Sequence, residues 1–311
     1  MVSFELTILG SSSALPTSKR FPTAHLLKVD ERFFLIDCGE GTQVQLRKFG
    51  FNPTRIHHIF ISHLHGDHVF GLFGLLSSMG MLGRKAALNL YGPDTLEPMM
   101  KQHFAFFGSL PFEIRYHIPC SDGDLPVFED DKLQVSPIPL KHRTTTFGYL
   151  FREKKRALNM RKESIENYGL GIADVVRIKQ GADHVTKSGE IILNQHLTLP
   201  PFLERSYAYI SDTVFLPSIS EKLRGVDLLF HEATFANKDE KLALATLHST
   251  ALQAATLAKA AGVGKLLIGH FSSRYKDYKL LVKEARSVFK DTYGVEDGDL
   301  YSIEQRRETT E

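Results

Sequence analysis

Four metal-binding side chains stand within six consecutive residues, closer together than chance or core packing would bring them. The six residues are His63-Leu64-His65-Gly66-Asp67-His68. Imidazole and carboxylate groups together suit zinc, with manganese or iron as lesser alternatives. The competing interpretation is a cluster of histidines on a surface turn. The density of ligand groups in this histidine motif favours a metal centre.

The residues around the histidine motif predict a strand before it and a helix after it. Residues 56–61 are mostly apolar and predict a buried strand, and residues 69–76 predict the first turns of a buried helix. On an extended segment, His63 and His65 face the same side and can bind one ion. Gly66 permits a sharp bend, which turns the last two ligands of the motif toward a second ion.

Several other predicted strands also end near residues that bind metals. The strands predicted at residues 133–140, 207–211 and 265–269 precede His142, Asp212 and His270. A lone histidine at a strand end is more often structural than a ligand. Here the histidine motif leaves coordination positions to fill, because two zinc ions with open positions need about six or seven protein ligands.

The candidate ligands divide into two sets. We expect one ion to be held by His63, His65 and His142, and the other by Asp67, His68 and His270, with Asp212 as the bridge. Two ions roughly 3.5–4 Å apart activate water near neutral pH and stabilise both oxygens of an in-line displacement, which suits phosphodiester hydrolysis. We expect Asp67 to be catalytic as well, orienting the attacking water or accepting its proton.

A second group of residues could supply a proton. Glu232 follows the strand predicted at residues 226–231, and His248 precedes the helix predicted at residues 250–261. A glutamate that orients a histidine holds an imidazolium ready to protonate a leaving oxygen. In the alternative interpretation, a neighbouring hydroxyl residue is the helix N-cap and His248 has no role in the chemistry. The residues alone do not decide between the two.

The composition is that of an ordinary globular protein. The chain has 311 residues, 42% of them hydrophobic, and a formal net charge of only +2, so any nucleic-acid binding must come from local charge. Cys38 and Cys120 are too few for a disulfide framework and fit a reducing compartment. We detect no signal peptide, and the longest uncharged run, residues 69–83, is too short for a membrane span. We expect a cytoplasmic protein without membrane association.

A basic stretch separates the two halves of the chain. Between residues 141 and 187, eleven Lys or Arg residues stand against five Asp or Glu residues. Few residues between about 152 and 201 follow the period of a core element. We therefore interpret residues 152–201 as an arm inserted into a single domain that spans residues 1–311.

Four further motifs span nearly the whole chain: Asp37-Cys38-Gly39-Glu40-Gly41-Thr42-Gln43, His231-Glu232-Ala233-Thr234-Phe235-Ala236, His248-Ser249-Thr250 and His270-Phe271-Ser272-Ser273-Arg274-Tyr275. Together with the seven candidate ligands they resemble the metallo-β-lactamase superfamily. Within it they resemble the ribonuclease Z family, whose members remove 3′ trailers from precursor tRNA. The second and third motifs are more specific to that family than the metal ligands are.

The resemblance implies an α/β fold, the metallo-β-lactamase αββα four-layer sandwich, with two zinc ions per subunit and a homodimer. It implies a zinc-dependent endoribonuclease that hydrolyses precursor tRNA and leaves a 3′-hydroxyl on the tRNA. It also implies that His248 and Glu232 form the proton-donating pair and that the arm binds tRNA. The candidate RNA-binding residues are Arg152, Lys154, Lys155, Arg156, Arg161, Lys162, Arg177 and Lys179.

The chain departs from the family pattern at two points. Arms of the family often carry a Gly-Pro pair near the tip, whereas residues 168–181 here contain no proline. The resemblance therefore does not imply the geometry of the tip. The bridging aspartate usually follows glycine, whereas Ser211 precedes Asp212 in this chain, and serine suits a strand end.

Two other functions stay open at this point. A small-molecule zinc hydrolase of the same superfamily, acting on phosphodiesters, aryl sulfates or thioesters, would keep its activity without the arm. A non-catalytic RNA-binding protein with structural zinc fits less well, because structural zinc sites are usually closed and cysteine-rich, and neither cysteine here is spaced like a ligand. The residues do not indicate whether cleavage falls before or after a CCA end.

Overall fold

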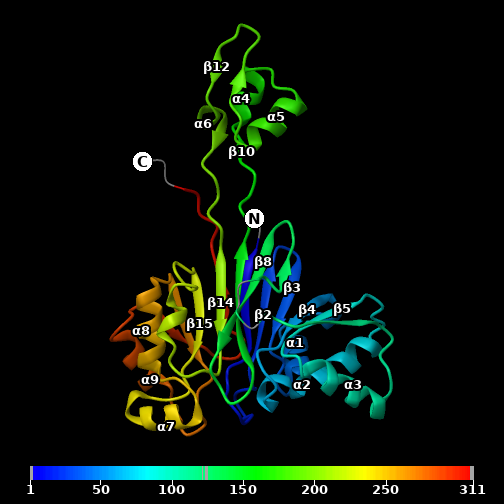
Figure 1. The fold of residues 1–311 in the computed structure, drawn as a ribbon, viewed down its shortest axis with the longest axis vertical. Coiled ribbons are helices and arrows are strands. Elements are labelled where there is room, and N and C mark those ends of the chain that lie inside the picture. The colour runs from blue at the N-terminus through cyan, green and yellow to red at the C-terminus, as the bar shows by residue number, and fades with distance from the viewer. Residues whose placement is uncertain (1–2, 121, 123–124, 309–311) are drawn as a thin grey trace.

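Two seven-stranded sheets form the centre of the computed structural model, which describes residues 3–120, 122 and 125–308 (Figure 1). The strands of the first sheet are β1 (Phe4–Gly10), β2 (Ala24–Val29), β3 (Arg32–Ile36), β4 (Ile56–Phe60), β5 (Leu88–Tyr91), β6 (Ile114–His117) and β18 (Leu300–Ser302). Those of the second are β7 (Phe128–Glu129), β8 (Leu133–Leu140), β9 (Thr146–Glu153), β14 (Ser206–Ile210), β15 (Leu228–Glu232), β16 (Lys265–Gly269) and β17 (Thr292–Gly294). Their orders are β18–β1–β2–β3–β4–β5–β6 and β17–β16–β15–β14–β9–β8–β7.

Helices cover the outer faces of both sheets (Figure 1). The first sheet is flanked by α1 (Thr42–Lys48), α2 (Gly66–Met81) and α3 (Leu96–Phe107). The second is flanked by α8 (Ala251–Ala261) and α9 (Lys279–Arg286), with α7 (Glu240–Thr246) beside them. Short 3₁₀ turns are η1 (Pro53–Arg55), η2 (Pro217–Ser220) and η3 (Asn237–Asp239). These layers confirm the predicted αββα sandwich. In the described part of the chain, no helix is long and apolar enough to span a membrane.

Alternate residues of one strand pack into different cores, which explains why the strands are apolar throughout. In β3, Phe34 and Ile36 lie in the core between the sheets, whereas Phe33 and Leu35 lie in the core beneath α2. Successive side chains of a strand point to opposite faces, so a sheet covered on both faces needs apolar residues at every position. The histidine motif therefore follows a strand that is fixed from both sides.

The helix after the histidine motif begins earlier than the sequence predicts. We expected it from residue 69, but α2 begins at Gly66, so Asp67 and His68 lie in its first turn. The backbone changes from extended at His65 to helical at Gly66, where the sequence predicts a bend, and Gly66 does so without a left-handed φ. Glycine gives room there instead: a Cβ at this position would lie 2.3 Å from the ring of Phe70.

Several strands end at one edge of the sandwich. β3 and β4 are parallel, as are β14, β15 and β16. β8 runs in the same direction as β14 because both are antiparallel to β9. The carboxyl ends of parallel strands meet at the same edge of a sheet. Residues that follow these strands therefore come together.

Residues 154–205, called the arm below, leave the body at the opposite edge and form a small separate unit (Figure 1). Its elements are β10 (Asn159–Met160), α4 (Lys162–Asn167), α5 (Ile172–Lys179), β11 (His184–Val185), β12 (Ile191–Ile192), α6 (Asn194–Leu197) and β13 (Thr198–Leu199). A core of four buried residues holds it together: Leu170, Ile178, Ile192 and Leu197. Two limbs, residues 154–158 going out and residues 200–205 returning, connect this head to β9 and β14.

Candidate metal centre and active site

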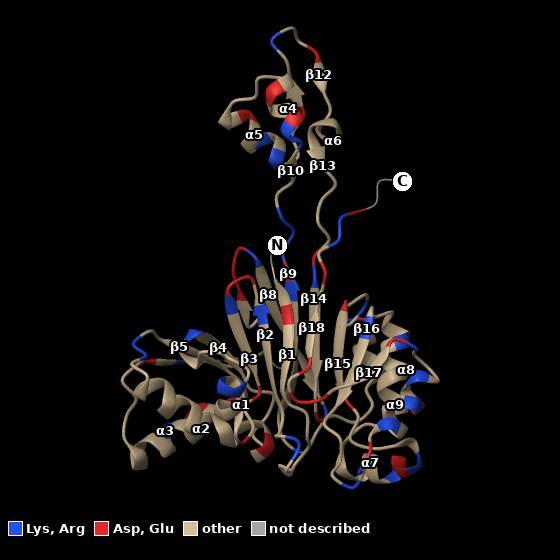
Figure 2. Cartoon of the chain, turned by 180° about the vertical axis from the view of Figure 1, so that it is seen from behind, with Lys and Arg blue, Asp and Glu red and all other residues tan. Residues whose placement is uncertain are grey.

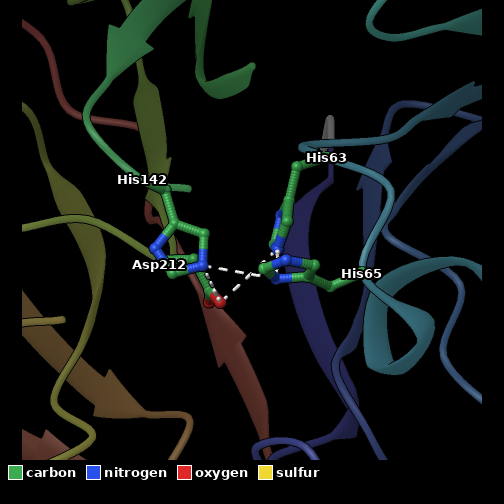
Figure 3. A group of neighbouring side chains, drawn as sticks. All are labelled: His63, His65, His142 and Asp212. Atoms are coloured by element: carbon green, nitrogen blue, oxygen red, sulfur yellow. Dashed lines mark hydrogen bonds and ion pairs between the residues drawn. The ribbon is translucent and has the colours of Figure 1, made fainter. Parts of the chain in front are cut away.

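The seven candidate metal ligands meet at the edge where the strands end. They form two groups, and the ligand atoms within each lie within 4.8 Å of one another; Asp212 and His270 also form a third such group with His248. The first group is His63, His65, His142 and Asp212, drawn in Figure 3, and the second is Asp67, His68 and His270. His63 follows β4 of the first sheet, whereas Asp212 follows β14 of the second. The site therefore joins the two sheets.

The first group has the spacing of a tetrahedral ligand set. His65 Nδ1 lies 3.0 Å from His63 Nε2 and 3.3 Å from His142 Nε2. Asp212 Oδ2 lies 3.5 Å from His63 Nε2 and 3.6 Å from His142 Nε2. Ligand atoms around a tetrahedral zinc with bonds of about 2.1 Å are about 3.4 Å apart. The four side chains fit one divalent ion.

The second group is connected to the first through Asp212. Asp67 Oδ2 lies 3.5 Å from His68 Nε2 and 3.3 Å from His270 Nε2. Asp212 Oδ1 lies 3.3 Å from His68 Nε2 and 3.2 Å from His270 Nε2. Asp212 thus directs one oxygen toward each group. His68 Nε2 is buried and makes no hydrogen bond to any described residue, so its lone pair suits an ion.

Four of the histidines have their second ring nitrogen held by a hydrogen bond. His63 Nδ1 bonds to Ser62 Oγ (3.0 Å), and His68 Nδ1 bonds to Asp37 Oδ2 (2.7 Å). His142 Nδ1 bonds to the Leu247 carbonyl (2.9 Å), and His270 Nδ1 bonds to Thr234 Oγ1 (2.9 Å). Such bonds fix the tautomer and the ring orientation of a metal-binding histidine. In each of these four, Nε2 is left to face the centre.

Asp37 is a site residue that the sequence analysis did not identify as one. Its buried carboxylate accepts hydrogen bonds from His68 Nδ1, from the Ser62 amide (2.7 Å) and hydroxyl (2.8 Å), and from Tyr209 OH (2.6 Å). The available signal was an acidic residue directly after the strand predicted at residues 32–36. Asp37, Asp212 and His270 all have left-handed φ angles, of 56°, 42° and 57°.

The environment sets the charge states of the ligands. Burial lowers the pKa of His63, His65 and His142, so these imidazoles are neutral near pH 7 and keep a lone pair. Burial alone would raise the pKa of Asp67, but His68 and His270 outweigh it and hold this pKa well below its usual range. Burial alone would lower the pKa of His68, but Asp212, Asp67 and Asp37 outweigh it and raise this pKa well above its usual range, so a divalent cation that binds there displaces a proton from His68.

His248 lies beside both ligand groups and is paired with Glu232. Its Nδ1 lies 3.0 Å from Glu232 Oε1, and its ring centroid lies 5.0 Å from that of His142. Glu232 is fully buried and also accepts hydrogen bonds from the backbone of Thr234 and Ser249. Burial acts to lower the pKa of His248, but the Glu232 carboxylate outweighs it and raises the pKa to about 9.

The helix-cap interpretation holds at the same time. Thr250 Oγ1 accepts a hydrogen bond from the Gln253 amide at 3.2 Å and so caps α8. The two interpretations of this motif therefore do not compete: Thr250 begins the helix and His248 faces the metal centre.

A cavity of about 320 Å³ opens over the metal-binding groups. Its lining includes four residues that the sequence analysis did not single out, namely Ser13, Ala14, Arg143 and Thr246. The Ala14 amide donates a hydrogen bond of 2.7 Å to Asp67 Oδ2. Arg143 follows a ligand directly, which was the only signal for it. The cavity gives a substrate access to His248 and Asp67 together.

The eight candidate RNA-binding residues do not share one environment. Three have anionic partners: Lys154 with Glu129, Arg156 with Glu153 and Arg177 with Asp174. The other five are Arg152, Lys155, Arg161, Lys162 and Lys179, which form no ion pair with any described residue. Figure 2 shows that the head of the arm carries acidic residues among the basic ones. The five unpaired cations are the stronger candidates for phosphate contacts.

Known proteins resemble this chain over nearly its whole length. Ribonuclease Z of Bacteroides fragilis strain YCH46 is 47% identical over 293 residues, which cover 94% of this chain and 96% of the relative. Ribonuclease Z of Parabacteroides distasonis is 46% identical over 304 residues, which cover 97% and 100%. A family model described as Anti-Pycsar protein Apyc1 matches residues 4–105.

Solved structures agree with the fold. The crystal structure of the short form of human tRNase Z matches with a TM-score of 0.70 and 26% identity, over 96% of this chain and 99% of that one. A metallo-beta-lactamase fold protein from Bacillus subtilis matches with a TM-score of 0.69 and 19% identity, over 97% and 100%, which shows the fold alone. With relatives of this identity and coverage, the chain belongs to the ribonuclease Z family of the metallo-β-lactamase superfamily.

Proposed function

We propose that this chain is a zinc-dependent endoribonuclease that removes the 3′ trailer from precursor tRNA and leaves a 3′-hydroxyl on the tRNA. The observation that supports it best is the His248–Glu232 pair beside two ligand groups that share Asp212. A phosphodiester with a poor leaving group needs both an activated water and a proton donor. The site offers residues for both tasks.

The proposal includes two zinc ions, with manganese as the alternative. His63, His65 and His142 would hold one ion, Asp67, His68 and His270 would hold the other, and Asp212 would contribute one oxygen to each. When bound, such ions activate water near neutral pH and neutralise charge on the phosphate. Asp67 orients the attacking water from its fixed position between His68, His270 and the Ala14 amide.

His248 is proposed as the general acid. Its Nδ1–H donates to Glu232, and its other nitrogen protonates the 3′-oxygen of the tRNA as the bond from that oxygen to phosphorus breaks. The trailer then leaves with the phosphate at its 5′ end. Glu232 keeps the imidazole charged and oriented, since its carboxylate is buried and held by three neighbouring residues.

The arm is proposed as the tRNA-binding part of one domain that spans residues 1–311. Support comes from the projection of the arm away from the body and from the four unpaired cations that it carries, Lys155, Arg161, Lys162 and Lys179. Basic side chains on such a surface bind the RNA backbone through phosphate contacts. Precursor tRNA as substrate implies work in the cytoplasm.

A homodimer is also part of the proposal. The arm and the metal centre lie at opposite edges of the sandwich, so the arm of one copy can present tRNA to the site of a second copy. Mixing a copy that carries Asp67→Ala with a copy that lacks the arm should restore cleavage. If the mixture is inactive although each protein folds and dimerises, this arrangement is wrong.

The deciding experiment is incubation of the protein with a trailer-bearing precursor tRNA and zinc or manganese, followed by mapping of the product ends. We expect one cut near the discriminator base, a 3′-hydroxyl on the tRNA and a 5′-phosphate on the trailer. Cleavage of a small chromogenic phosphodiester without any cut in the tRNA would instead support the small-molecule hydrolase. Binding of tRNA without hydrolysis of either substrate would support the non-catalytic alternative.

A further inference from the structure

The tail of the chain, residues 303–308, runs along the returning limb of the arm (Figure 1). The Leu203 amide donates a hydrogen bond of 2.9 Å to the Arg306 carbonyl, and the Glu308 amide donates one of 3.0 Å to the Pro201 carbonyl. Between them, Phe202 and Arg307 form an antiparallel β-bridge. The tail thus extends the returning limb into a short two-stranded ribbon.

The side chain of Arg307 strengthens this contact. Its guanidinium lies 3.8 Å from the centroid of the Phe202 ring, and its Nη1 donates a hydrogen bond of 2.5 Å to the Pro200 carbonyl. A planar guanidinium can stack on a ring and bond a carbonyl at once, which an ammonium cannot. Arg307 therefore contacts both the Phe202 ring and the backbone of the returning limb.

The two limbs of the arm do not brace each other. At the root, the Glu153 amide bonds to the Arg205 carbonyl at 2.9 Å, and in the head Asn159 pairs with Leu199. Between these points, no backbone hydrogen bond joins residues 154–158 to residues 200–204, all of which are described. Over this gap the returning limb is paired with the tail instead.

The tail is itself anchored to the body at two points. The Ile303 amide donates a hydrogen bond of 2.9 Å to the Phe4 carbonyl, and Arg306 Nη2 lies 2.5 Å from Asp227 Oδ1. Arg205, at the root of the returning limb, donates from Nη1 to the Ile303 carbonyl at 3.2 Å and forms a buried ion pair with Glu153, whose Oε1 lies 2.8 Å from its Nη2. The tail therefore connects a fixed part of the second sheet to the free-standing limb.

We infer that the tail is a brace that fixes the direction of the arm, and that Arg307 and Phe202 are positioning residues for tRNA. This inference rests on the proposed function for its effect on cleavage, though not for its effect on the limb. A limb without the brace samples more directions, so fewer collisions with tRNA find the arm correctly aimed. The loss should therefore appear in KM for tRNA, while the chemistry at the distant metal centre is unchanged.

The test compares four altered proteins: Arg307→Ala, Arg307→Lys, Phe202→Leu and a chain that ends at Gln305. The control is Glu304→Ala, because Glu304 is an exposed tail residue whose side chain forms no hydrogen bond or ion pair with the described residues of the arm. We expect the shortened chain to raise KM for precursor tRNA about tenfold and the three substitutions about threefold to fivefold, with kcat and hydrolysis of a chromogenic phosphodiester within about twofold. Hydrogen exchange at the Leu203 amide should accelerate in the same four proteins.

Each outcome separates the brace from its alternatives. If Arg307→Ala raises KM while Arg307→Lys and Phe202→Leu do not, the cation contacts RNA directly and the brace is wrong. Unchanged exchange at Leu203 in the shortened chain would also overturn it. If the unaltered protein fails to cut tRNA, the proposed function fails, whereas the exchange at Leu203 still tests the brace.

Discussion

The metal centre and the arm are built in opposite ways. At the centre, the side chains are mostly buried, come from both sheets, and most are held by further hydrogen bonds, as His68 is held by Asp37. The arm depends on a core of four buried residues and carries its charges on the surface. Two limbs and a tail attach it to the body.

This difference reflects what each region must do. Hydrolysis requires atoms held within a fraction of an ångström, which only a packed and hydrogen-bonded site provides. Binding of an RNA backbone requires positive charge over a wide surface and tolerates small displacements. Changes at the centre should therefore affect every substrate, whereas changes in the arm should affect only RNA.

The largest effect is expected at Asp67. Asp67→Ala removes a ligand of the second group and the group that orients water, so activity should fall more than about 1,000-fold on precursor tRNA and on a chromogenic phosphodiester alike. Initial rates on both substrates measure this, with zinc content determined by atomic absorption. Loss on tRNA alone would contradict the shared role of the centre.

The next largest effect separates the two substrates by their leaving groups. His248→Ala should lower kcat on precursor tRNA about 100-fold to 1,000-fold, because the departing 3′-oxygen needs a proton. A nitrophenolate leaving group does not, so a nitrophenyl phosphodiester should be hydrolysed within about tenfold of the normal rate. Equal losses on both would make His248 a structural residue of the centre instead of a proton donor.

Removal of the arm should lower activity on precursor tRNA and leave activity on the chromogenic phosphodiester nearly unchanged. A chain in which a short glycine linker joins Glu153 to Arg205 keeps the ends where they already meet, so the body should fold. We expect kcat/KM on precursor tRNA to fall about 100-fold and chromogenic activity to stay within about twofold. Thermal unfolding checks the body, and an equal loss on both substrates would show that the arm supports the centre itself.

A smaller effect is expected on the pH profile. The donating form of His248 is protonated, so tRNA cleavage should be present below about pH 9 and fall as the pH rises through that value. Glu232→Gln removes the charge that raises the pKa, so the alkaline fall should move to lower pH, with about tenfold lower kcat at pH 8. Profiles of kcat from pH 6 to 10 measure the shift, and identical alkaline limbs would refute the pairing.

The smallest effect concerns individual cations of the arm. A double variant that combines Lys155→Ala and Lys162→Ala should bind tRNA about fivefold more weakly. It should also reduce the slope of log affinity against log salt concentration by up to about two. Arg177→Ala is the matched control, because that guanidinium already has a partner in Asp174. Filter binding over a series of salt concentrations distinguishes them. Equal slopes for both variants would mean that ion pairing on the arm does not select the contacts.

The fold was predicted through the resemblance of the motifs to the metallo-β-lactamase superfamily, while the apolar runs predicted individual strands. The candidate ligands were visible because each follows a predicted strand or lies in one dense motif. Asp37 was not recognised as a site residue, because its role depends on contacts with His68 and Tyr209, which are 31 and 172 residues away. The start of α2 was misplaced because its first turn carries ligands instead of apolar residues.

The ion pairs formed by the cations of the arm could not be predicted from the sequence either. Lys154 directly follows β9 and pairs with Glu129 of β7, which lies two strands away in the sheet, so a count of local charge treats Lys154 as free. The brace was hidden for the same reason, because Phe202 and Arg307 are distant in the chain. Contacts of this kind depend on the tertiary arrangement and leave no local pattern.

The left-handed backbone at Asp37, Asp212 and His270 has an evolutionary consequence. A residue with a Cβ in this region is disfavoured by about 1–2 kcal/mol relative to its ordinary conformation, and glycine is not. At Asp37 the buried hydrogen bonds that the carboxylate accepts outweigh this cost. Selection for heat resistance alone would favour glycine at Asp212 and His270 and erase the centre. A library screened first for stability and only later for catalysis would lose the enzyme early, so both traits must be selected together.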